Sequence, residues 1–174
     1  MHRTAKLVLA GSVVFLLFPS CSRTSSPADQ VSGPTLDVPN FAIAVRLSPA
    51  AKERLTSIHE SIGVLAMFDG DPLPGQGTYN APMRNVVLGS AERLADRNNV
   101  ATFNGVRIPL LEWEKLSDKN YFVTINVYSA RRAEDNNLLD CNDPMSQRIE
   151  TFRGKSIEVS CWLIGEPGTH RPSS

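Results

Sequence analysis

Large apolar side chains alternate with small or charged ones in Phe41-Ala42-Ile43-Ala44-Val45-Arg46-Leu47. A period of two residues is typical of a β-strand with one buried face, because successive side chains on a strand point to opposite sides. The pattern changes directly afterwards, at Ser48-Pro49-Ala50-Ala51. Serine is a preferred N-cap and proline is favoured at the first helical position. The sequence therefore predicts a strand over residues 41–47 that runs into a short helix.

Similar alternation recurs along the rest of the chain, and it predicts further strands near residues 62–68, 85–89, 100–103, 121–128 and 157–163. Asn104-Gly105 predicts a type I′ hairpin between residues 100–103 and the apolar residues that follow. A second short helix is expected over residues 109–116. No strand-helix-strand unit repeats and no glycine-rich nucleotide loop occurs. The pattern therefore predicts a mainly β fold: an antiparallel β-sandwich, or alternatively a small barrel, of six to seven strands with one or two short helices, over residues 41–166.

The composition of the 174 residues is that of one globular domain with appendages, with 41% hydrophobic and 21% charged residues. Eighteen Lys and Arg residues balance eighteen Asp and Glu residues. A nucleic-acid-binding protein is expected to carry a concentrated basic stripe. The even charge balance therefore argues against a nucleic-acid partner.

The first residues have the composition of a secretory signal peptide. Arg3 and Lys6 precede an apolar run over residues 7–18. A helix of that length rises about 18 Å, whereas the hydrocarbon core of a bilayer is about 30 Å thick. The segment is therefore too short for a permanent membrane span, and residues 1–20 are predicted to be a signal peptide.

Phe18-Pro19-Ser20-Cys21, at the end of the apolar run, resembles the lipobox of bacterial lipoproteins. The small Ser20 fits that motif, whereas leucine is usual where Phe18 stands and Pro19 is uncommon at its position; ordinary signal-peptide cleavage nearby is the alternative. The resemblance implies that acylated Cys21 anchors the protein to the lipid bilayer. In Gram-negative lipoproteins an aspartate after the cysteine favours the inner membrane, so Ser22 indicates the outer membrane of the cell envelope, facing the periplasm.

Two segments outside the predicted domain lack any apolar period. Residues 21–40 are rich in Ser, Thr, Pro and Gly and are predicted to be a disordered tether, with an r.m.s. reach of about 20–25 Å. Residues 167–174 are predicted to be a flexible tail.

Cys141 and Cys161 both lie in the C-terminal third of the chain. An exported domain folds where thiols oxidise, so this pair is predicted to form a disulfide. The alternative is two separate buried thiols, because free cysteine behaves as a small hydrophobic residue.

Few residues of the predicted domain offer catalytic or metal-binding chemistry. His59 is the one histidine between the tether and the tail, and we expect it to be a surface or helix-terminal residue. No G-x-S-x-G, H-E-x-x-H or C-x-x-C motif occurs. Asp69 with Asp71, and the acidic residues between Glu134 and Asp143, could offer oxygen ligands to calcium, but neither group has the EF-hand spacing, so solvated turns are favoured. We therefore predict no catalytic residue, no metal site, no cofactor and no enzyme activity.

The densest polar passage follows the predicted strand over residues 121–128. Its candidate binding loop contains Arg131, Arg132, Asp135 and Asn136. The two arginines could bind a carboxylate or a phosphate while the sheet and the disulfide keep the loop still. Alternatively, the arginines pair with Glu134 and Asp135 while two following leucines close the end of the sandwich. We favour this second interpretation, in which the passage is an ordinary surface loop, over the binding loop.

Four passages over residues 41–166 resemble a group of small proteobacterial envelope lipoproteins of uncharacterised role: residues 47–51, 68–72, 126–141 and 159–166. The hypothesis that follows is a membrane-anchored, non-catalytic β domain that binds a protein or envelope component. The alternatives are a structural part of a secretion or envelope assembly, similar to the β-sandwich lipoprotein of the type VI secretion complex, a cell-wall-directed hydrolase that uses His59 or Asp69 and Asp71, and a lysozyme inhibitor.

Overall fold

The computed structural model describes residues 33–75 and 85–167, and these residues form a mainly β domain with three short helices. The predicted signal peptide, Cys21 and most of the predicted tether and tail lie outside the described residues. In chain order the elements are β1 (Thr35–Asp37), β2 (Phe41–Leu47), α1 (Pro49–Ser57), β3 (Ile62–Gly70), β4 (Val86–Leu94), β5 (Val100–Phe103), β6 (Arg107–Pro109), α2 (Leu110–Glu114), β7 (Phe122–Ser129), β8 (Leu139–Cys141), β9 (Gln147–Arg148), α3 (Ile149–Phe152) and β10 (Ser156–Leu163).

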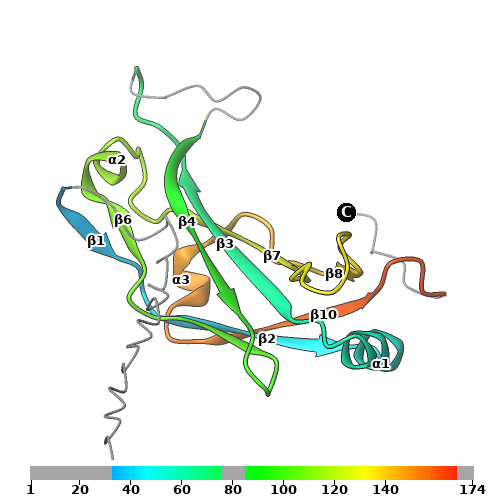
Figure 1. Ribbon diagram of the computed structural model, residues 1–174. Helices are drawn as coiled ribbons and strands as arrows, with labels where there is room; N and C mark the ends of the chain where they lie inside the picture. The colour runs from blue at the N-terminus through cyan, green and yellow to red at the C-terminus, as the bar shows by residue number, and fades with distance from the viewer. Residues whose placement is uncertain (1–32, 76–84, 168–174) are drawn as a thin grey trace, which may run out of the picture.

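Two four-stranded sheets pack as a sandwich (Figure 1), and a third, two-stranded sheet lies at one end. Their strand orders are β5-β2-β10-β8, β4-β3-β7-β9 and β1-β6. The predicted mainly β, sandwich-like class is confirmed. One pairing departs from the predicted antiparallel pattern: β2 and β10 are parallel, from Ser156 opposite Ala42 to Cys161 opposite Leu47. The first and last long strands thus run side by side at the centre of one sheet.

The prediction of six to seven strands and one or two helices is too low, because the shortest elements show no period in the sequence. The strands β1, β8 and β9 have only two or three residues each. The tether boundary at residue 40 is also wrong, since β1 pairs with β6 and Val38 is buried. The ordered domain therefore begins before residue 41.

The predicted hairpin at Asn104-Gly105 is wrong as well. Gly105 has the expected left-handed φ of 65°, but the strands on either side do not pair with each other. Instead, β5 pairs with β2 and β6 pairs with β1. The turn carries the chain from one sheet to another because the apolar residues on its two sides bury against different parts of the core.

The predicted helix after the first strand is confirmed, with its capping residues. The Ser48 hydroxyl accepts a hydrogen bond from the Ala51 N–H at 3.1 Å, and Pro49 occupies the first turn. Only Ala51 and Leu55 of α1 are buried. The helix therefore covers the sandwich end where β2 finishes rather than packing across a sheet face.

Aromatic rings fill the opposite half of the core. Phe41 and Phe103 stack with ring centroids 4.7 Å apart, and Phe152 meets Phe41 edge-on at 5.3 Å. These rings belong to β2, β5 and α3, so their contacts fasten α3 to the sheet. The inward residues of β3 and β7 complete the core from the other sheet.

Side chains close the edge between the two sheets where regular strands are short. The N–H groups of Val127 and Ser129 on β7 donate to the Asp143 carboxylate at 3.2 Å and to the Asn137 amide oxygen at 2.9 Å. Two residues before Val127, the Ile125 N–H donates to the Pro144 carbonyl at 2.9 Å. These acceptors take the place of a neighbouring strand.

Gly63 on β3 gives room to an aromatic ring on the outer sheet face. The Tyr128 ring crosses over Gly63 from β7, and its hydroxyl donates to Glu92 on β4. A Cβ at position 63 would lie 2.6 Å from the Tyr128 Cζ. Gly63 thus serves close packing, since its backbone is not left-handed.

We expect Gly63→Ala to lower the free energy of unfolding by about 1–3 kcal/mol, measured by urea denaturation, because the ring must move out of its position. The same substitution in a Tyr128→Ala background should cost clearly less. An equal cost in both backgrounds would show that the close contact with the ring is not the cause.

Candidate functional site

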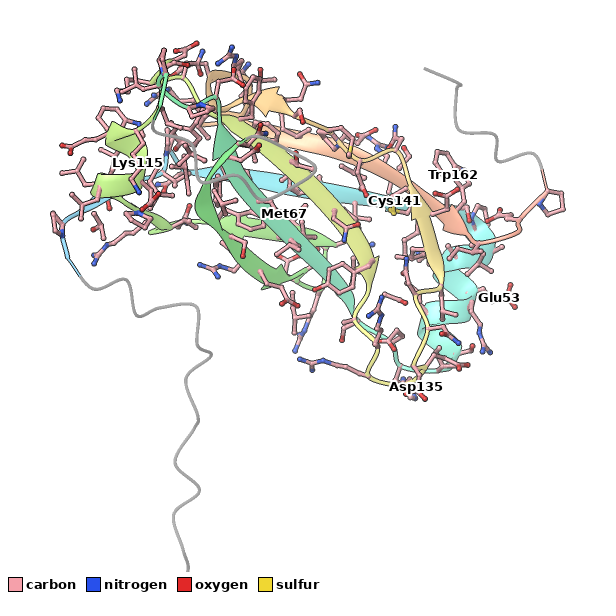
Figure 2. All side chains as sticks on the ribbon, turned by 90° about the horizontal axis from the view of Figure 1, so that it is seen from above. Glu53, Met67, Lys115, Asp135, Cys141 and Trp162 are labelled. Atoms are coloured by element: carbon pink, nitrogen blue, oxygen red, sulfur yellow. A yellow bond between two sulfur atoms is a disulfide. The ribbon has the colours of Figure 1, made fainter. Side chains whose placement is uncertain are left out.

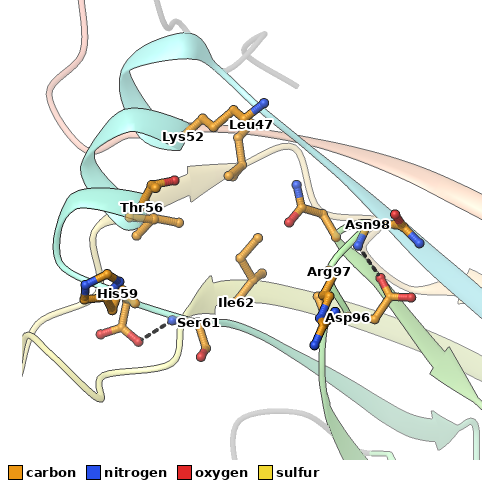
Figure 3. A pocket seen from close by; sticks show the side chains of 13 residues that line it. Leu47, Lys52, Thr56, His59, Ser61, Ile62, Asp96, Arg97 and Asn98 are labelled. Atoms are coloured by element: carbon orange, nitrogen blue, oxygen red, sulfur yellow. Dashed lines mark hydrogen bonds between the residues drawn. The ribbon is translucent and has the colours of Figure 1, made fainter.

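A pocket of about 540 Å³ opens at the end of the sandwich that carries α1, which we call the α1 end (Figure 3). One wall is α1 with the residues after it, and the other is the turn between β4 and β5. The lining residues are Leu47, Lys52, Leu55, Thr56, His59, Glu60, Ser61, Ile62, Ala95, Asp96, Arg97, Asn98 and Asn99. Segments far apart in the sequence therefore build one concave surface.

The pocket combines apolar and polar surfaces. Leu55 and Ile62 are buried, and Leu47 packs against the core between the two walls. Exposed Lys52 and Arg97 lie on opposite walls of the pocket. Pockets of this mixed kind, with an apolar base and a few polar groups, are typical of binding sites.

The turn between β4 and β5 is fixed by its own side chain and by β2. The Asp96 carboxylate accepts hydrogen bonds from the N–H groups of Asn98, at 2.8 Å, and Val100, at 3.0 Å. Asn99 has a left-handed φ of 60°, and its carbonyl accepts the Val45 N–H at 2.8 Å. This wall of the pocket is therefore ordered before any ligand arrives.

His59 ends α1 in a position where glycine is usual. The helix closes with a Schellman pair, in which the Glu60 N–H donates to the Leu55 carbonyl at 2.9 Å and the His59 N–H donates to the Thr56 carbonyl at 3.2 Å. His59 takes the left-handed conformation of this motif, with φ 56°. The left-handed conformation costs a residue that has a Cβ about 1 kcal/mol relative to glycine. The expected helix-terminal position of His59 is confirmed, and that position places it in the pocket wall.

The Glu60 side chain joins the pocket to the loop after β7. One carboxylate oxygen accepts the Ser61 N–H at 2.8 Å. The other accepts the N–H groups of Arg132 at 2.9 Å, Ala133 at 2.8 Å and Glu134 at 3.4 Å. Successive N–H groups that converge on one anion form a nest. The nest in this loop is thus filled by a carboxylate of the same chain.

The predicted binding loop lies beside the pocket at the α1 end, where Figure 2 labels Asp135 and Glu53. Arg131, Arg132, Asp135 and Asn136 are all exposed. The alternative pairing of Arg131 and Arg132 with Glu134 and Asp135 is wrong. Among the described residues, Glu134 pairs with Arg54 on α1 instead. The leucines do close the sandwich end as expected: Leu139 is buried and Leu138 packs against the core.

The predicted disulfide is present. Cys141 on β8 and Cys161 on β10 stand directly opposite each other, with Cα atoms 4.1 Å apart, and both are buried. The bridge holds the edge strand β8, and the loop that leads into it, against the sheet.

The acidic residues considered for calcium do not gather into a site. Asp69 receives a hydrogen bond from the Asn85 amide, and Asp71 is exposed. Over residues 33–75 and 85–167, no three His, Cys, Asp or Glu side chains are close enough to hold a metal ion together. Within the same ranges no helix has the length and apolarity needed to cross a membrane.

The Glu60 contact predicts an acid-dependent loss of stability. Burial raises the pKa of the Glu60 carboxyl, but hydrogen bonds from four backbone N–H groups lower it more, so its pKa lies below the ordinary value of 4.5. The ionised form is therefore favoured by folding, and its contribution is present above pH 4.5 and is lost as the pH falls through the lower folded pKa.

Wild type should accordingly be more stable than Glu60→Gln at about pH 7, and the difference should shrink as the pH is lowered below 4.5, in urea denaturation at each pH. Amide hydrogen exchange should show faster exchange at residues 132–134 in the variant at neutral pH. A stability difference that does not shrink as the pH is lowered below 4.5 would contradict the role of the ionised carboxylate.

Comparison with protein-family models, curated proteins and solved structures found no match to this chain. The class of the protein is therefore defined by its fold and by the α1 end: a mainly β sandwich-like domain with a preformed pocket and a fastened loop at one end.

Proposed function

We propose that this protein is a lipid-anchored envelope protein whose β domain binds a partner through its α1 end and has no catalytic activity of its own. The observation that carries the proposal is the position of the α1 end relative to the chain entry. The helix α1, which supplies one wall of the pocket, and the loop after β7 lie at the end of the domain opposite β1 (Figure 1).

The order of the strands also places the point where the chain enters the domain at the end opposite the α1 end. The Leu110 N–H on α2 donates to the Pro34 carbonyl at 3.0 Å, so the chain enters beside α2 and the β1-β6 sheet. From there β2 crosses the domain, and its seven residues span about 23 Å before α1 begins. Figure 2 likewise shows Lys115, just after α2, at the opposite end from Glu53 on α1.

A lipid on Cys21 would attach the domain through its β1 end, so the α1 end would be the end farther from the point of attachment and would stay accessible to a partner. Support for the lipid comes from the lipobox-like residues around Cys21 and the short apolar run before them. Support for binding comes from the ordered pocket and the loop fastened by Glu60 and by the nearby disulfide. Rigid loops on a sheet scaffold are frequent carriers of binding residues.

Two measurements test the two halves of the proposal. Labelled palmitate should enter the wild-type chain and should not enter Cys21→Ser; incorporation into both would refute the anchor. A photo-crosslinking residue at exposed Asn98, in the pocket wall, should give a specific adduct in intact cells.

The matched control carries the same crosslinker at Leu111 on α2, which is 63% exposed at the opposite end. Position 111 should give no such adduct, or only lipid. Adducts of equal yield at both positions would show that the α1 end is not the binding surface.

A further inference from the structure

The loop after β7 is closed at its base. The buried Ser129 binds the two residues at which the loop returns to the domain. Its N–H donates to the Asn137 amide oxygen at 2.9 Å, and its hydroxyl accepts the Leu138 N–H at 2.8 Å. Residues 131–136, which we call the strap, therefore leave and rejoin the domain at one fixed place.

The strap is held against α1 by polar contacts. All six of its residues are described by the structure and none of them is buried, so no apolar side chain anchors it. The Glu134 side chain pairs with Arg54 on α1, and the Glu60 carboxylate accepts the N–H groups of residues 132–134. An exposed ion pair contributes little to stability, and a carboxylate can exchange its protein donors for water at a modest net cost. The strap therefore depends on Glu60 for its position.

Four backbone N–H groups converge on the Glu60 carboxylate. One oxygen accepts three of them, from Arg132 at 2.9 Å, Ala133 at 2.8 Å and Glu134 at 3.4 Å. The other oxygen accepts the Ser61 N–H at 2.8 Å (Figure 3). Because both oxygens belong to one carboxylate, donors from two distant segments surround a single group. Main-chain N–H groups that converge in this way form an anion-binding site.

The Glu60 side chain fills this site from the surface of the domain. Glu60 is half-buried, and the strap beside it is exposed. Rotation of the Glu60 side chain would free all four donors, because they belong to the main chain and not to Glu60 itself. The site would then be open to solvent with its donors already in place. Since the group it holds is a carboxylate, another carboxylate is the ligand that matches it.

We propose that the strap binds a carboxylate of the partner in this four-donor site, and that Glu60 is an internal competitor that keeps the site closed until the partner arrives. The inference rests on the proposed function, for it names the group that the binding end recognises. Two sources supply the carboxylate: an acidic side chain of a protein partner and a small free carboxylate.

Glu60→Ala in the full-length chain empties the site, and acetate is the first probe. Acetate should shift the ¹⁵N amide signals of residues 61 and 132–134 saturably, with a Kd in the millimolar range because the ligand is so small. Acetamide has the same shape without the charge and should give no saturable shift. Wild type should show none with either probe, since Glu60 occupies the donors.

Glu53→Ala is the matched control for the loss of a carboxylate. Glu53 is an exposed residue of α1 and makes no ion pair among the described residues. This variant should respond to acetate as wild type does. Equal binding of acetate by wild type and Glu60→Ala, or binding by neither, would overturn the inference.

A folding defect in Glu60→Ala would not hide the result. A ligand that binds only the folded chain stabilises it, so acetate should raise the urea midpoint of Glu60→Ala. Chloride at the same ionic strength should not, and neither salt should distinguish wild type from Glu53→Ala. An equal response of Glu60→Ala to acetate and chloride would overturn the inference.

A short acidic peptide separates the two sources of the carboxylate. Acetyl-Gly-Asp-Gly amide has one carboxylate, and the same peptide with asparagine has none. Tighter binding of the aspartate peptide than of acetate to Glu60→Ala would assign the site to an acidic side chain of a protein. Tighter binding of acetate would assign it to a small free carboxylate. Equal binding of the aspartate and asparagine peptides would overturn the specificity for a carboxylate.

The role of Glu60 as a competitor is tested in intact cells. A photo-crosslinking residue at exposed Asp135, on the strap, should give several times more partner adduct in the Glu60→Ala background than in wild type. Glu53→Ala should leave the yield unchanged. An unchanged or lower yield in Glu60→Ala would overturn the competitor role.

Failure of this inference is distinguishable from failure of the proposed function. Palmitate incorporation at Cys21 and a specific adduct from position 98, with no binding of acetate to Glu60→Ala, would refute the carboxylate site alone. Acetate binding to Glu60→Ala without palmitate incorporation would refute the anchor alone.

Discussion

Replacing Cys141 and Cys161 together by alanine is expected to lower the free energy of unfolding by about 3 kcal/mol. The bridge closes a loop of 20 residues, and a crosslink of that span removes chain entropy from the unfolded state. The native state also depends on it, because β8 has only three residues and pairs with a strand on one side only, β10. Urea denaturation of wild type and the double variant, at equal protein concentration, measures the loss.

Reduction of the wild-type protein provides the internal control for this prediction. A thiol reductant should destabilise wild type by a similar amount and should leave the double variant unchanged. Asp140→Ala, on β8 but outside the core, should cost much less. A loss below about 1 kcal/mol in the double variant would show that the neighbouring hydrogen bonds, including Asn142 N–H to the Ser160 carbonyl, hold β8 without the bridge.

Phe103→Ala should lower the free energy of unfolding by about 3–5 kcal/mol, because it removes a fully buried ring from the aromatic cluster. Phe103 stacks on Phe41, which in turn contacts Phe152 of α3. The cavity left by the ring would therefore lie between β5 and β2, beside Phe41. Neighbouring strands on both sides of β2 limit how far the site can collapse.

Phe122→Ala is the matched control for the buried ring. Phe122 is only partly buried on the outer face of β7, where the Arg148 guanidinium lies 4.1 Å from the ring centroid. Its loss should cost clearly less than that of Phe103 in urea denaturation. Similar costs for the two variants would show that the stacked cluster is not the centre of the core.

The longer elements could be predicted from the sequence because their burial is periodic. Residues 41–47 and 121–128 alternate cleanly, and the structure places β2 and β7 there. The shortest strands could not be predicted, because two or three residues define no period. The parallel pairing of β2 with β10 could not be predicted from local sequence patterns either, because it depends on which distant strands meet in space.

The candidate site was only partly predictable for a similar reason. Arg131 and Arg132 stood out because charged residues cluster after a strand, and they do lie at the α1 end. Lys52 and Arg97 carry no local signal, because the pocket forms where a helix meets a distant turn. Glu60 was missed because a single carboxylate beside a strand resembles any surface glutamate. Its significance comes from three backbone N–H groups more than 70 residues away.

The parallel pair of β2 and β10 determines when the domain can fold. β2 is the first long strand and β10 is the last, so the sheet that holds both stays incomplete until residues 156–163 have been synthesised and released. Contacts between such distant parts of a chain form slowly, because a long loop must close first. The Cys141–Cys161 bridge joins the same last strand, so it too must close late. A chain of this topology stays incompletely folded until its last long strand is available, and the disulfide can form only at that stage.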